Sequence, residues 1–482
     1  MKATTAAPAA AIATRHLDAL KALASPGGFL EAEADTLAYR QSWRYGYTGK
    51  TPLVLRPKST EEVAALVTYC NRNRISIVPQ GGNTGLTFAG QPDESNGEVV
   101  LSTDRLNKIR GIDLGNDTMT VEAGVILQQI QEAAAAQKRL FPLSLGAQGS
   151  CRIGGNISTN AGGVQVLRYG NTRNLVLGLE VVLPDGRIWN GLRALRKDNT
   201  GYDLKQLFIG GEGTLGIITA AVLKLFPLPT ATETAWVAVP SPAASVALLG
   251  RMKERMGEAV SAFELIRDAI VEFTVEGVPG NEYPMKERHP WYVLMDVSGQ
   301  GAPGSLHEPL AEALASAVED GIVTDALICG STQQARKLWK LREDMADGQK
   351  AAGGSISHDI SVPVSDIAAF VAEADAALEK VYPEIRHCCF GHVGDGNLHY
   401  NPVRPLAWTQ ERFMQEYGAV NRIVHDIVIK YGGSISAEHG IGRIRLAENH
   451  HYKSPVEIDL LRALKRTFDP AGIMNPGKLV EM

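Results

Sequence analysis

Two glycine-rich stretches constrain the fold of this chain more than any other feature. Residues 79–86 read Pro-Gln-Gly-Gly-Asn-Thr-Gly-Leu, and residues 154–163 read Gly-Gly-Asn-Ile-Ser-Thr-Asn-Ala-Gly-Gly. Backbone N–H groups in such loops can converge on an anion because no Cβ stands in the way. Two of these loops in one domain can hold the two ends of a dinucleotide, so the sequence predicts a dinucleotide site.

The first stretch follows a predicted strand, helix and strand over residues 53–79. Ser59 is expected to cap the helix, with Glu62 completing a capping box. Apolar residues then recur at the spacing i, i+3, i+4 and i+7, which predicts one buried helix face. That face comprises Val63, Leu66, Val67 and Cys70. Strands are also expected around 99–101, 119–121, 175–189 and 217–226, with a helix near 126–137.

A third glycine-rich stretch, Gly211-Glu-Gly-Thr-Leu-Gly216, matches the GxGxxG pattern of nicotinamide-binding folds. That pattern marks a dinucleotide site only where it follows a strand and opens a helix. Here Ile217, Ile218 and Thr219 follow, and a β-branched run of this kind favours a strand. The sequence therefore argues against an NAD site.

The chain changes character after Pro227-Leu-Pro229, which reads as a linker. Beyond it, longer helices alternate with strands such as the one expected at 291–297. The expected helices span residues 243–256, 306–319, 332–348, 364–380 and 411–431. The second half therefore reads as a separate α+β domain.

The second half carries a histidine hairpin, Gly391-His-Val-Gly-Asp-Gly-Asn-Leu-His-Tyr-Asn401. Asp395-Gly396 is the strongest two-residue turn signal, of type I′. With that turn, His392 would pair directly with His399, with Cβ atoms roughly 5 Å apart. Two imidazoles at that spacing can bind one metal ion.

A carboxylate and a third imidazole follow in Ser436-Ala-Glu-His-Gly-Ile-Gly-Arg443. One carboxylate with two histidines is a common ligand set for Zn²⁺ or Mn²⁺, so Glu438 is the candidate third ligand. His439 would remain as a general base, because the pKa of imidazole suits that role near neutral pH.

Arg342 is a candidate anion-binding residue. A continuous helix over 333–348 would place Trp339, Arg342 and Ala346 on one face. A guanidinium there could bind a substrate carboxylate in bidentate fashion. The alternative is a surface salt bridge to Glu343 or Asp344.

Composition excludes several classes of protein. The net charge of -5 gives no electrostatic case for nucleic acid binding. No apolar run approaches the roughly 20 residues that span a bilayer. Five scattered cysteines without a CxxC pair suit a reducing cytosol, so we expect a cytoplasmic protein, at most peripheral to a membrane. Residues 1–14 read as a disordered tail.

The first half resembles the FAD domain of the vanillyl-alcohol oxidase and p-cresol methylhydroxylase superfamily. The matching stretches are 56–63, 79–86, 154–163 and 210–216. Some members attach the flavin covalently through a histidine in the first loop. This chain has Asn83 and Thr84 there, so non-covalent FAD is expected, and Cys151 is expected to be a small buried residue.

The resemblance implies a set of flavin-binding residues in these loops and in the C-terminal segment. They are Pro79, Gly81, Gly82, Asn83, Thr84, Gly85, Leu86, Ser150, Gly154, Gly155, Asn156, Thr159, Asn160, Gly162, Gly163, Gly213, Gly216, Ile217 and Asn475.

The second half resembles the C-terminal domain of bacterial glycolate oxidase subunits, D-lactate dehydrogenases and D-2-hydroxyglutarate dehydrogenases, the last being nearest in pattern. The match covers 339–343, 358–363, the hairpin, the Glu-His-Gly-Ile-Gly stretch and 468–478. By that resemblance His392, His399 and Glu438 bind the metal, with Zn²⁺ favoured over Mn²⁺. His439 is the catalytic base and contacts substrate, as do Arg342 and Asn401.

The implied fold is α+β. A p-cresol methylhydroxylase-type FAD domain with two subdomains would span 1–229. A substrate and metal-binding cap domain, with an antiparallel sheet flanked by helices, would span 230–445. Residues 446–482 would return to the FAD domain.

The implied enzyme is an FAD-dependent dehydrogenase that oxidises a D-2-hydroxy acid to the 2-oxo acid. Hydride would pass to flavin N5, and the metal would assist deprotonation of the hydroxyl by His439. D-2-hydroxyglutarate is the first choice of substrate. Two positions depart from the family pattern, Ser357 where a Lys often stands and Ala346 where Ser or Thr is usual. Both lie on the side that binds substrate anions, so D-lactate, D-mandelate or another D-2-hydroxy acid is the alternative.

The electron acceptor could be an electron-transfer flavoprotein, a quinone or a cytochrome, and the resemblance favours the first; the chain could form a homodimer. Three other classes remain as alternatives. They are a flavin oxidase that uses O₂, a flavin-free metallohydrolase, and a flavoprotein without catalytic activity. The glycine-rich loops argue against the second, and the presence of Glu438 and His439 argues against the third.

Overall fold

The fold is given by a computed structural model that describes residues 11–43 and 46–482. The expected disordered tail lies largely outside this range, and Thr14 begins α1 (Thr14–Leu23). The chain forms two compact units. Unit 1 comprises Met1–Gly162, Asn171–Leu228 and Glu438–Met482, and unit 2 comprises Gly163–Gly170 and Pro229–Ala437. Each unit is described by itself below.

A four-stranded sheet in unit 1 carries the first glycine-rich stretch. Its order is β1-β2-β4-β3, and β4 pairs in parallel with both β2 and β3. The strands are β1 (Phe29–Leu30), β2 (Val54–Leu55), β3 (Ser76–Gln80) and β4 (Glu98–Ser102). Helix α3 (Thr60–Asn73) buries its predicted face, Val63, Leu66, Val67 and Cys70, against this sheet.

The start of α3 confirms half of the predicted capping box. The Ser59 hydroxyl accepts the Glu62 N–H at 3.2 Å. The Glu62 carboxylate instead accepts the N–H groups of Lys58 and Ser25, at 2.9 and 2.7 Å. Glu62 therefore ties the helix start to a distant segment of the chain rather than to its own cap residue.

The second sheet of unit 1 is antiparallel, in the order β5-β6-β10-β8-β9. Its strands are β5 (Ile109–Asp113), β6 (Thr118–Glu122), β8 (Val176–Val182), β9 (Ile188–Gly191) and β10 (Ile217–Lys224). Strand β10 begins directly after Gly216, so the GxGxxG match opens a strand, as predicted.

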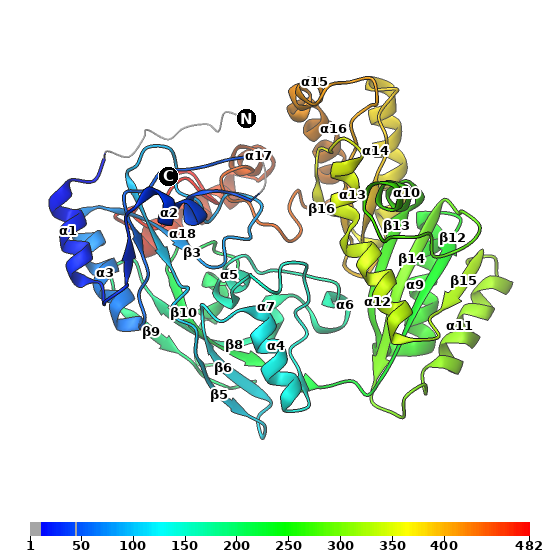
Figure 1. Cartoon of the computed structure of the whole chain (residues 1–482), viewed down its shortest axis with the longest axis horizontal. Coiled ribbons are helices and arrows are strands. Elements are labelled where there is room, and N and C mark those ends of the chain that lie inside the picture. The colour runs from blue at the N-terminus through cyan, green and yellow to red at the C-terminus, as the bar shows by residue number, and fades with distance from the viewer. Residues whose placement is uncertain (1–10, 44–45) are drawn as a thin grey trace. The chain divides into compact units, whose positions relative to one another are not determined.

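The C-terminal segment belongs to unit 1 and extends its first sheet, red beside blue in Figure 1. Ile77 N–H donates to Ile473 O at 2.8 Å, and Asn475 N–H donates to Ile77 O at 2.8 Å. Helix α18 (Pro455–Phe468) precedes this segment. Its Lys465 ammonium donates to the carbonyls of Thr214 and Met474 and to Asp469, at 2.6–2.8 Å.

Unit 2 is built on a seven-stranded antiparallel sheet in the order β15-β12-β14-β13-β17-β18-β16 (Figure 1). The strands are β12 (Ala231–Val239), β13 (Val260–Arg267), β14 (Trp291–Gly299), β15 (Asp325–Ile328), β16 (Asp359–Ser361), β17 (Cys389–His392) and β18 (Asn397–Tyr400). The expected α+β class and antiparallel sheet are confirmed.

Helices α12 and α13 pack on the sheet face that presents Trp236, Tyr292 and Leu294. Two helices expected to be continuous are interrupted. The predicted 332–348 helix ends at Glu343 in α12 (Thr332–Glu343), and α13 (Met345–Ala351) follows. The predicted 411–431 helix divides into α15 (Gln410–Gln415) and α16 (Tyr417–Lys430).

The remaining elements connect these layers. In unit 1 they are α2 (Glu33–Arg40), α4 (Leu127–Ala136), β7 (Arg139–Leu140), α5 (Ile153–Ser158), α7 (Thr172–Leu175), α8 (Lys205–Phe208), β11 (Phe226–Pro227) and α17 (Leu446–Tyr452). In unit 2 they are α6 (Val166–Tyr169), α9 (Pro242–Met256), α10 (Asp268–Gly277), α11 (His307–Glu319) and α14 (Ile367–Val381). In the described part of the chain, no helix has both the length and the apolar composition needed to cross a bilayer.

Candidate functional site

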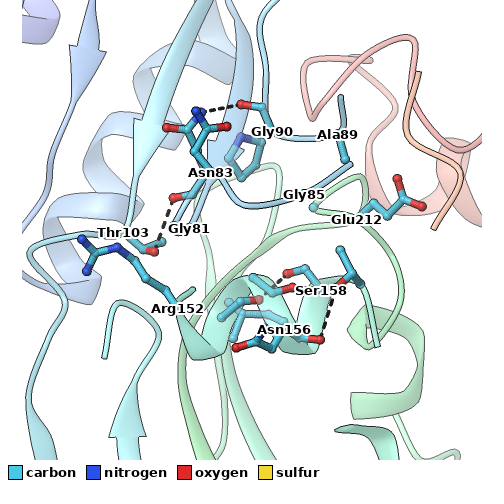
Figure 2. Close-up of a pocket in the computed structure, with 18 of the residues that line it drawn as sticks. Gly81, Asn83, Gly85, Ala89, Gly90, Thr103, Arg152, Asn156, Ser158 and Glu212 are labelled. Atoms are coloured by element: carbon cyan, nitrogen blue, oxygen red, sulfur yellow. Dashed lines mark hydrogen bonds between the residues drawn. The ribbon is translucent and has the colours of Figure 1, made fainter. Parts of the chain in front are cut away.

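A pocket in unit 1 lies where the glycine-rich stretches meet. Figure 2 shows the loop with Gly81, Asn83 and Gly85 on one side and the helix with Asn156 and Ser158 on another. Thirteen expected flavin contacts line it: Pro79, Gly81, Gly82, Asn83, Thr84, Gly85, Gly154, Gly155, Asn156, Thr159, Gly213, Gly216 and Ile217. Six do not: Leu86, Ser150, Asn160, Gly162, Gly163 and Asn475.

Residues 154–158 of the second glycine-rich stretch belong to the short helix α5, so the expectation of a loop over 154–163 is wrong for that part. Glycine is required for packing at Gly154, since an added Cβ would lie 2.6 Å from the Cβ of Ala123. In the same way, a Cβ on Gly82 would lie 2.3 Å from Ser150 O. A Cβ on Gly81 would lie 3.3 Å from Gly155 Cα, so the two stretches approach each other closely, and glycine backbone forms part of the pocket lining.

Two asparagines brace the pocket walls. Asn83 has φ of +56°, a left-handed conformation that Asn tolerates better than most residues. Its side-chain amide donates to Ala38 O and Gln41 O, so it fixes the loop. Asn475 donates to Ala89 O and Glu212 O at 3.1 and 2.7 Å, which ties the C-terminal segment to two segments of the pocket lining.

Several lining residues were not anticipated, among them Arg152, which could face an anion. Arg152 supplies a cation, and its guanidinium also donates to Gly124 O at 2.6 Å. Cys151 lines the pocket as well, and burial raises the pKa of its thiol. A single arginine before a glycine-rich run was the available signal, and it is too common to be specific.

Glu212 joins the pocket lining to the loop that carries Glu438 and His439. Its carboxylate accepts the N–H groups of Ile441 and Gly442, each at 2.7 Å. Glu212 is fully buried, and this burial raises its pKa. The hydroxyl of Thr87, which directly follows the first glycine-rich stretch, donates to His439 O at 3.3 Å. The backbone around His439 is thus held by segments that also form the FAD unit.

The histidine hairpin has a different register from the predicted one. His392 pairs with Asn397, and His399 pairs with Phe390. A 3₁₀ turn over Val393–Asp395 and Gly396 in the left-handed conformation form the loop, in place of a two-residue type I′ turn. The Asp395 side chain accepts the Asn397 N–H, which favours this longer turn. The shift is two residues, so both histidines stay on one sheet face, with ring centroids 5.7 Å apart.

A buried carboxylate, Glu264, lies on that same face, directly opposite His392 in the β13–β17 pairing. Its Oε1 contacts His392 Nδ1. Its Oε2 accepts from Nε of Arg342 at 2.8 Å and forms an ion pair with Nη2 of Arg342 at 2.7 Å. Burial alone would raise the pKa of Glu264, but the contacts with His392 and with the Arg342 guanidinium outweigh it and lower the pKa to about 2.

Arg342 therefore forms a salt bridge, but a buried one with Glu264 rather than with Glu343 or Asp344. Trp339 lies on the same face of α12, and its indole N–H donates to Asp296 at 3.1 Å. Burial raises the pKa of Asp296. Ala346 does not share this helix face, because α12 ends before it and α13 begins.

The three candidate metal ligands have atoms close enough for one metal ion. Glu438 follows Ala437, whose N–H donates to Asp359 O in β16 at 3.0 Å. One ligand atom each of His392, His399 and Glu438 lie within 4.8 Å of one another. A second group, Asp359, Glu438 and His439, also has one ligand atom each within 4.8 Å of one another. In this group, His439 Nε2 lies 3.6 Å from Glu438 Oε1. Either group could hold a divalent cation.

Asn401, the expected substrate contact, is buried after β18. Its amide oxygen accepts the His358 N–H at 2.8 Å, and its amide nitrogen donates to Gln349 at 3.1 Å. One hydrogen of that nitrogen remains for another acceptor.

Sequence reasoning missed Glu264. The signal was present, since Glu264 is a lone charge in the apolar run Ala262-Phe-Glu-Leu-Ile266. A charged residue at a buried strand position is almost always paired. Its partners lie far away in the sequence, however, and nothing local identifies them.

The chain matches two protein families over most of its length. Residues 51–191 match the FAD binding domain family, and residues 228–479 match the family of FAD linked oxidases, C-terminal domain. A D-2-hydroxyglutarate dehydrogenase of Stutzerimonas stutzeri is 38% identical, over 96% of this chain and 98% of the relative. A D-2-hydroxyglutarate–pyruvate transhydrogenase of Saccharomyces cerevisiae is 34% identical, over 93% of this chain and 90% of the relative.

Solved structures share the fold at lower identity. A structure of p-cresol methylhydroxylase with bound substrate superposes with a TM-score of 0.75 and 17% identity. The superposition covers 98% of this chain and 99% of that chain.

Proposed function

Because the chain belongs to the FAD-linked oxidase family and is an FAD-dependent dehydrogenase of D-2-hydroxy acids, we propose that it oxidises D-2-hydroxyglutarate to the 2-oxo acid. The carrying observation is the buried cluster of Glu264, His392 and Arg342 on one face of the unit 2 sheet. Relatives named for this substrate match nearly the whole chain, which supports the choice.

FAD would be held non-covalently in the unit 1 pocket. Glycine backbone from 81–85 and 154–155 would face its phosphates, and Arg152 would balance their charge. Among the described residues of the lining, no histidine is present, and Cys151 is the one candidate for attachment. Its raised thiol pKa disfavours the reactive thiolate. When bound, FAD would accept the electrons and hydrogen that leave the substrate carbon.

His392, His399 and Glu438 would hold a divalent cation, with Zn²⁺ favoured over Mn²⁺. The residues suit such an ion, because their ligand atoms converge and Glu264 already occupies His392 Nδ1. A cation there would lower the pKa of a substrate hydroxyl. The second group, with Asp359 and His439, is the alternative arrangement.

The chain's own residues would perform the remaining steps. His439 Nε2 would take the hydroxyl proton, helped by the nearby Glu438 carboxylate. Arg342 uses Nε and Nη2 for Glu264, so Nη1 would bind a substrate carboxylate. Asn401 would donate its remaining amide hydrogen to substrate oxygen.

A less charged substrate such as D-lactate or D-mandelate is the second candidate. Ser357 and Ala346 favour it, because neither offers a cation for a second carboxylate. The electron acceptor would be an electron-transfer flavoprotein or a quinone. A transhydrogenase among the relatives adds a 2-oxo acid as a further kind of acceptor. We further propose a cytosolic homodimer.

A visible spectrum of the purified protein tests this function. D-2-Hydroxyglutarate, D-lactate and D-mandelate are added in turn without oxygen, each with its L-enantiomer as control. Bleaching of the flavin by D-2-hydroxyglutarate alone supports the proposal. Bleaching by one of the other acids would identify that acid as the substrate instead. A protein that cannot be loaded with FAD overturns the proposed function. Peroxide formed in air would identify an oxidase.

A further inference from the structure

We propose that Glu264 is a positioning residue that fixes the tautomer of His392 and the orientation of Arg342 at the same time. The inference rests on the proposed metal site and adds a residue to it. It makes one buried carboxylate the common support of a metal ligand and of the substrate-binding guanidinium.

The geometry divides the two oxygens of Glu264 between two partners. Oε1 contacts Nδ1 of His392, which lies directly opposite on β17. Oε2 accepts from Nε of Arg342 on α12 and forms an ion pair with Nη2 of the same guanidinium. The side chain of Glu264 is 0% exposed, so water cannot replace either partner. A buried carboxylate in such a position costs stability unless both contacts are kept.

The contact to His392 determines which ring nitrogen can bind a metal. A carboxylate oxygen only accepts hydrogen bonds, so Nδ1 must carry the hydrogen. A neutral imidazole has one N–H, and Nε2 therefore keeps its lone pair. Ligating histidines commonly donate their other nitrogen to a carboxylate in this way, and loss of that partner costs about 10–100-fold in metal affinity. Glu264 thus prepares Nε2 of His392 as the ligand atom.

The contact to Arg342 fixes the guanidinium from one side while an aromatic ring supports it from another. The Arg342 Cζ atom lies 4.6 Å from the centroid of the Phe390 ring. Phe390 is two residues before His392 on β17, so it faces the same side of the sheet. With Nε and Nη2 engaged, the plane of the guanidinium is set and Nη1 is presented outward.

A glutamine at this position separates positioning from packing. Arg342 can only donate, so the amide oxygen of Glu264→Gln must face it. The amide NH₂ group then faces His392 Nδ1, which has to become the acceptor. The ring hydrogen moves to Nε2, and the ligand atom is lost although size and shape are nearly unchanged.

The matched control is Asp296→Asn. Asp296 is another buried carboxylate on the same sheet face, one strand away on β14. Its side chain accepts from Thr234 and Trp339 and contacts neither His392 nor Arg342. An amide oxygen can accept from both donors, so this variant removes a buried charge and leaves the metal ligands alone.

The experiment measures Zn²⁺ affinity of the FAD-loaded protein after removal of metal with a chelator. Zn²⁺ is titrated in competition with a chromophoric chelator, and FAD content and far-UV circular dichroism are recorded for each variant. We expect one Zn²⁺ per chain in the parent protein, about 10–100-fold weaker binding in Glu264→Gln, and parent-like binding in Asp296→Asn.

Three outcomes overturn the inference in distinguishable ways. Equal affinity in the parent and Glu264→Gln overturns the role of Glu264 and leaves the metal site standing. Equal losses in Glu264→Gln and Asp296→Asn would show a general effect of charge removal. A parent protein that binds no stoichiometric Zn²⁺ overturns the metal site and the inference together. If Glu264→Gln does not fold, Glu264→Asp replaces it; this shorter carboxylate cannot reach both partners, and unchanged affinity there also overturns the proposal.

Discussion

The carboxylate of Glu212 accepts the backbone N–H of Gly442 at 2.7 Å, and it accepts the neighbouring Ile441 N–H at the same distance. Glu212 lines the flavin pocket, while residues 438–442 carry the proposed base and one proposed metal ligand. A segment that lines the proposed cofactor pocket therefore also fixes the backbone of the proposed catalytic loop.

Replacement of Glu212 should destabilise unit 1. Glu212→Ala leaves two buried N–H groups without an acceptor, and each costs about 1–3 kcal/mol in the free energy of unfolding. Glu212→Gln keeps one acceptor oxygen, so its loss should be smaller. Urea unfolding of the FAD-free proteins measures the difference. Equal stability of the parent and Glu212→Ala would show that this contact contributes nothing to the fold.

Loss of the proposed base should lower turnover without loss of flavin. His439→Ala removes the group that takes the hydroxyl proton, a step worth on the order of 10²–10⁴-fold in rate. Anaerobic flavin reduction in a stopped-flow instrument measures it. The control is His451→Ala, an exposed histidine on α17. A His439→Ala protein that reduces its flavin as fast as the control would remove His439 from the mechanism.

A lysine cannot replace Arg342. Glu264 is contacted by two nitrogens of the guanidinium fork, and an ammonium group cannot reproduce that geometry. Arg342→Lys should raise KM for a D-2-hydroxy acid by more than about 10-fold, the loss of roughly 1.4 kcal/mol of binding. Arg336→Lys, an exposed position on the same helix, is the control. Similar KM values for the two variants would argue against carboxylate binding by Arg342.

The flavin should leave the protein on denaturation. Acid precipitation of the purified protein is expected to give a yellow supernatant and a white pellet, because the lining offers no histidine among its described residues and Cys151 is a poor thiolate. A yellow pellet would show covalent attachment. If Cys151→Ala then turned the pellet white, Cys151 would be the attachment site.

Lys478 should give the stability of unit 1 a pH dependence on the alkaline side. Burial lowers the pKa of Lys478 from 10.5 to about 8. Between these values the unfolded chain binds more protons than the folded protein, so the free energy of unfolding rises with pH, by up to about 3 kcal/mol. Lys478→Met should remove this rise, which urea unfolding across that range can measure. Parallel pH profiles for the two proteins would show that Lys478 stays charged in the folded protein, because other groups offset the cost of burying its charge.

Local patterns predicted elements well and their ends less well. The buried face of α3 and the strand after Gly216 follow directly from spacing and β-branching. The break of the 332–348 helix at Asp344 has no glycine or proline to announce it. In the hairpin, the Asp395-Gly396 signal identified the turn but misjudged its length, because the Asx contact to Asn397 competes with a two-residue turn.

The site could be predicted only where its residues form motifs. His392, His399, Glu438 and His439 lie in short recognisable runs, and Arg342 has a helix face. Glu212 and Glu264 act through partners brought close by the fold: Glu212 meets Ile441 and Gly442, and Glu264 meets His392 and Arg342. No local pattern in a single sequence identifies such pairs. The residues that support the site could therefore not be predicted, although its candidate ligands and base could.

The order of segments in unit 1 also bears on how the protein is made. The edge of its first sheet at β3 receives Ile473 and Asn475, and Lys465 joins Thr214 to the same closing segment. A ribosome synthesises β3 before residues 229–437 of unit 2 and these partners after them. The proposed flavin pocket therefore cannot acquire its final bracing before this segment has been synthesised. Stable cofactor loading should begin only after this segment has emerged, and until then the open edge of β3 in a nascent chain would have to be shielded from aggregation.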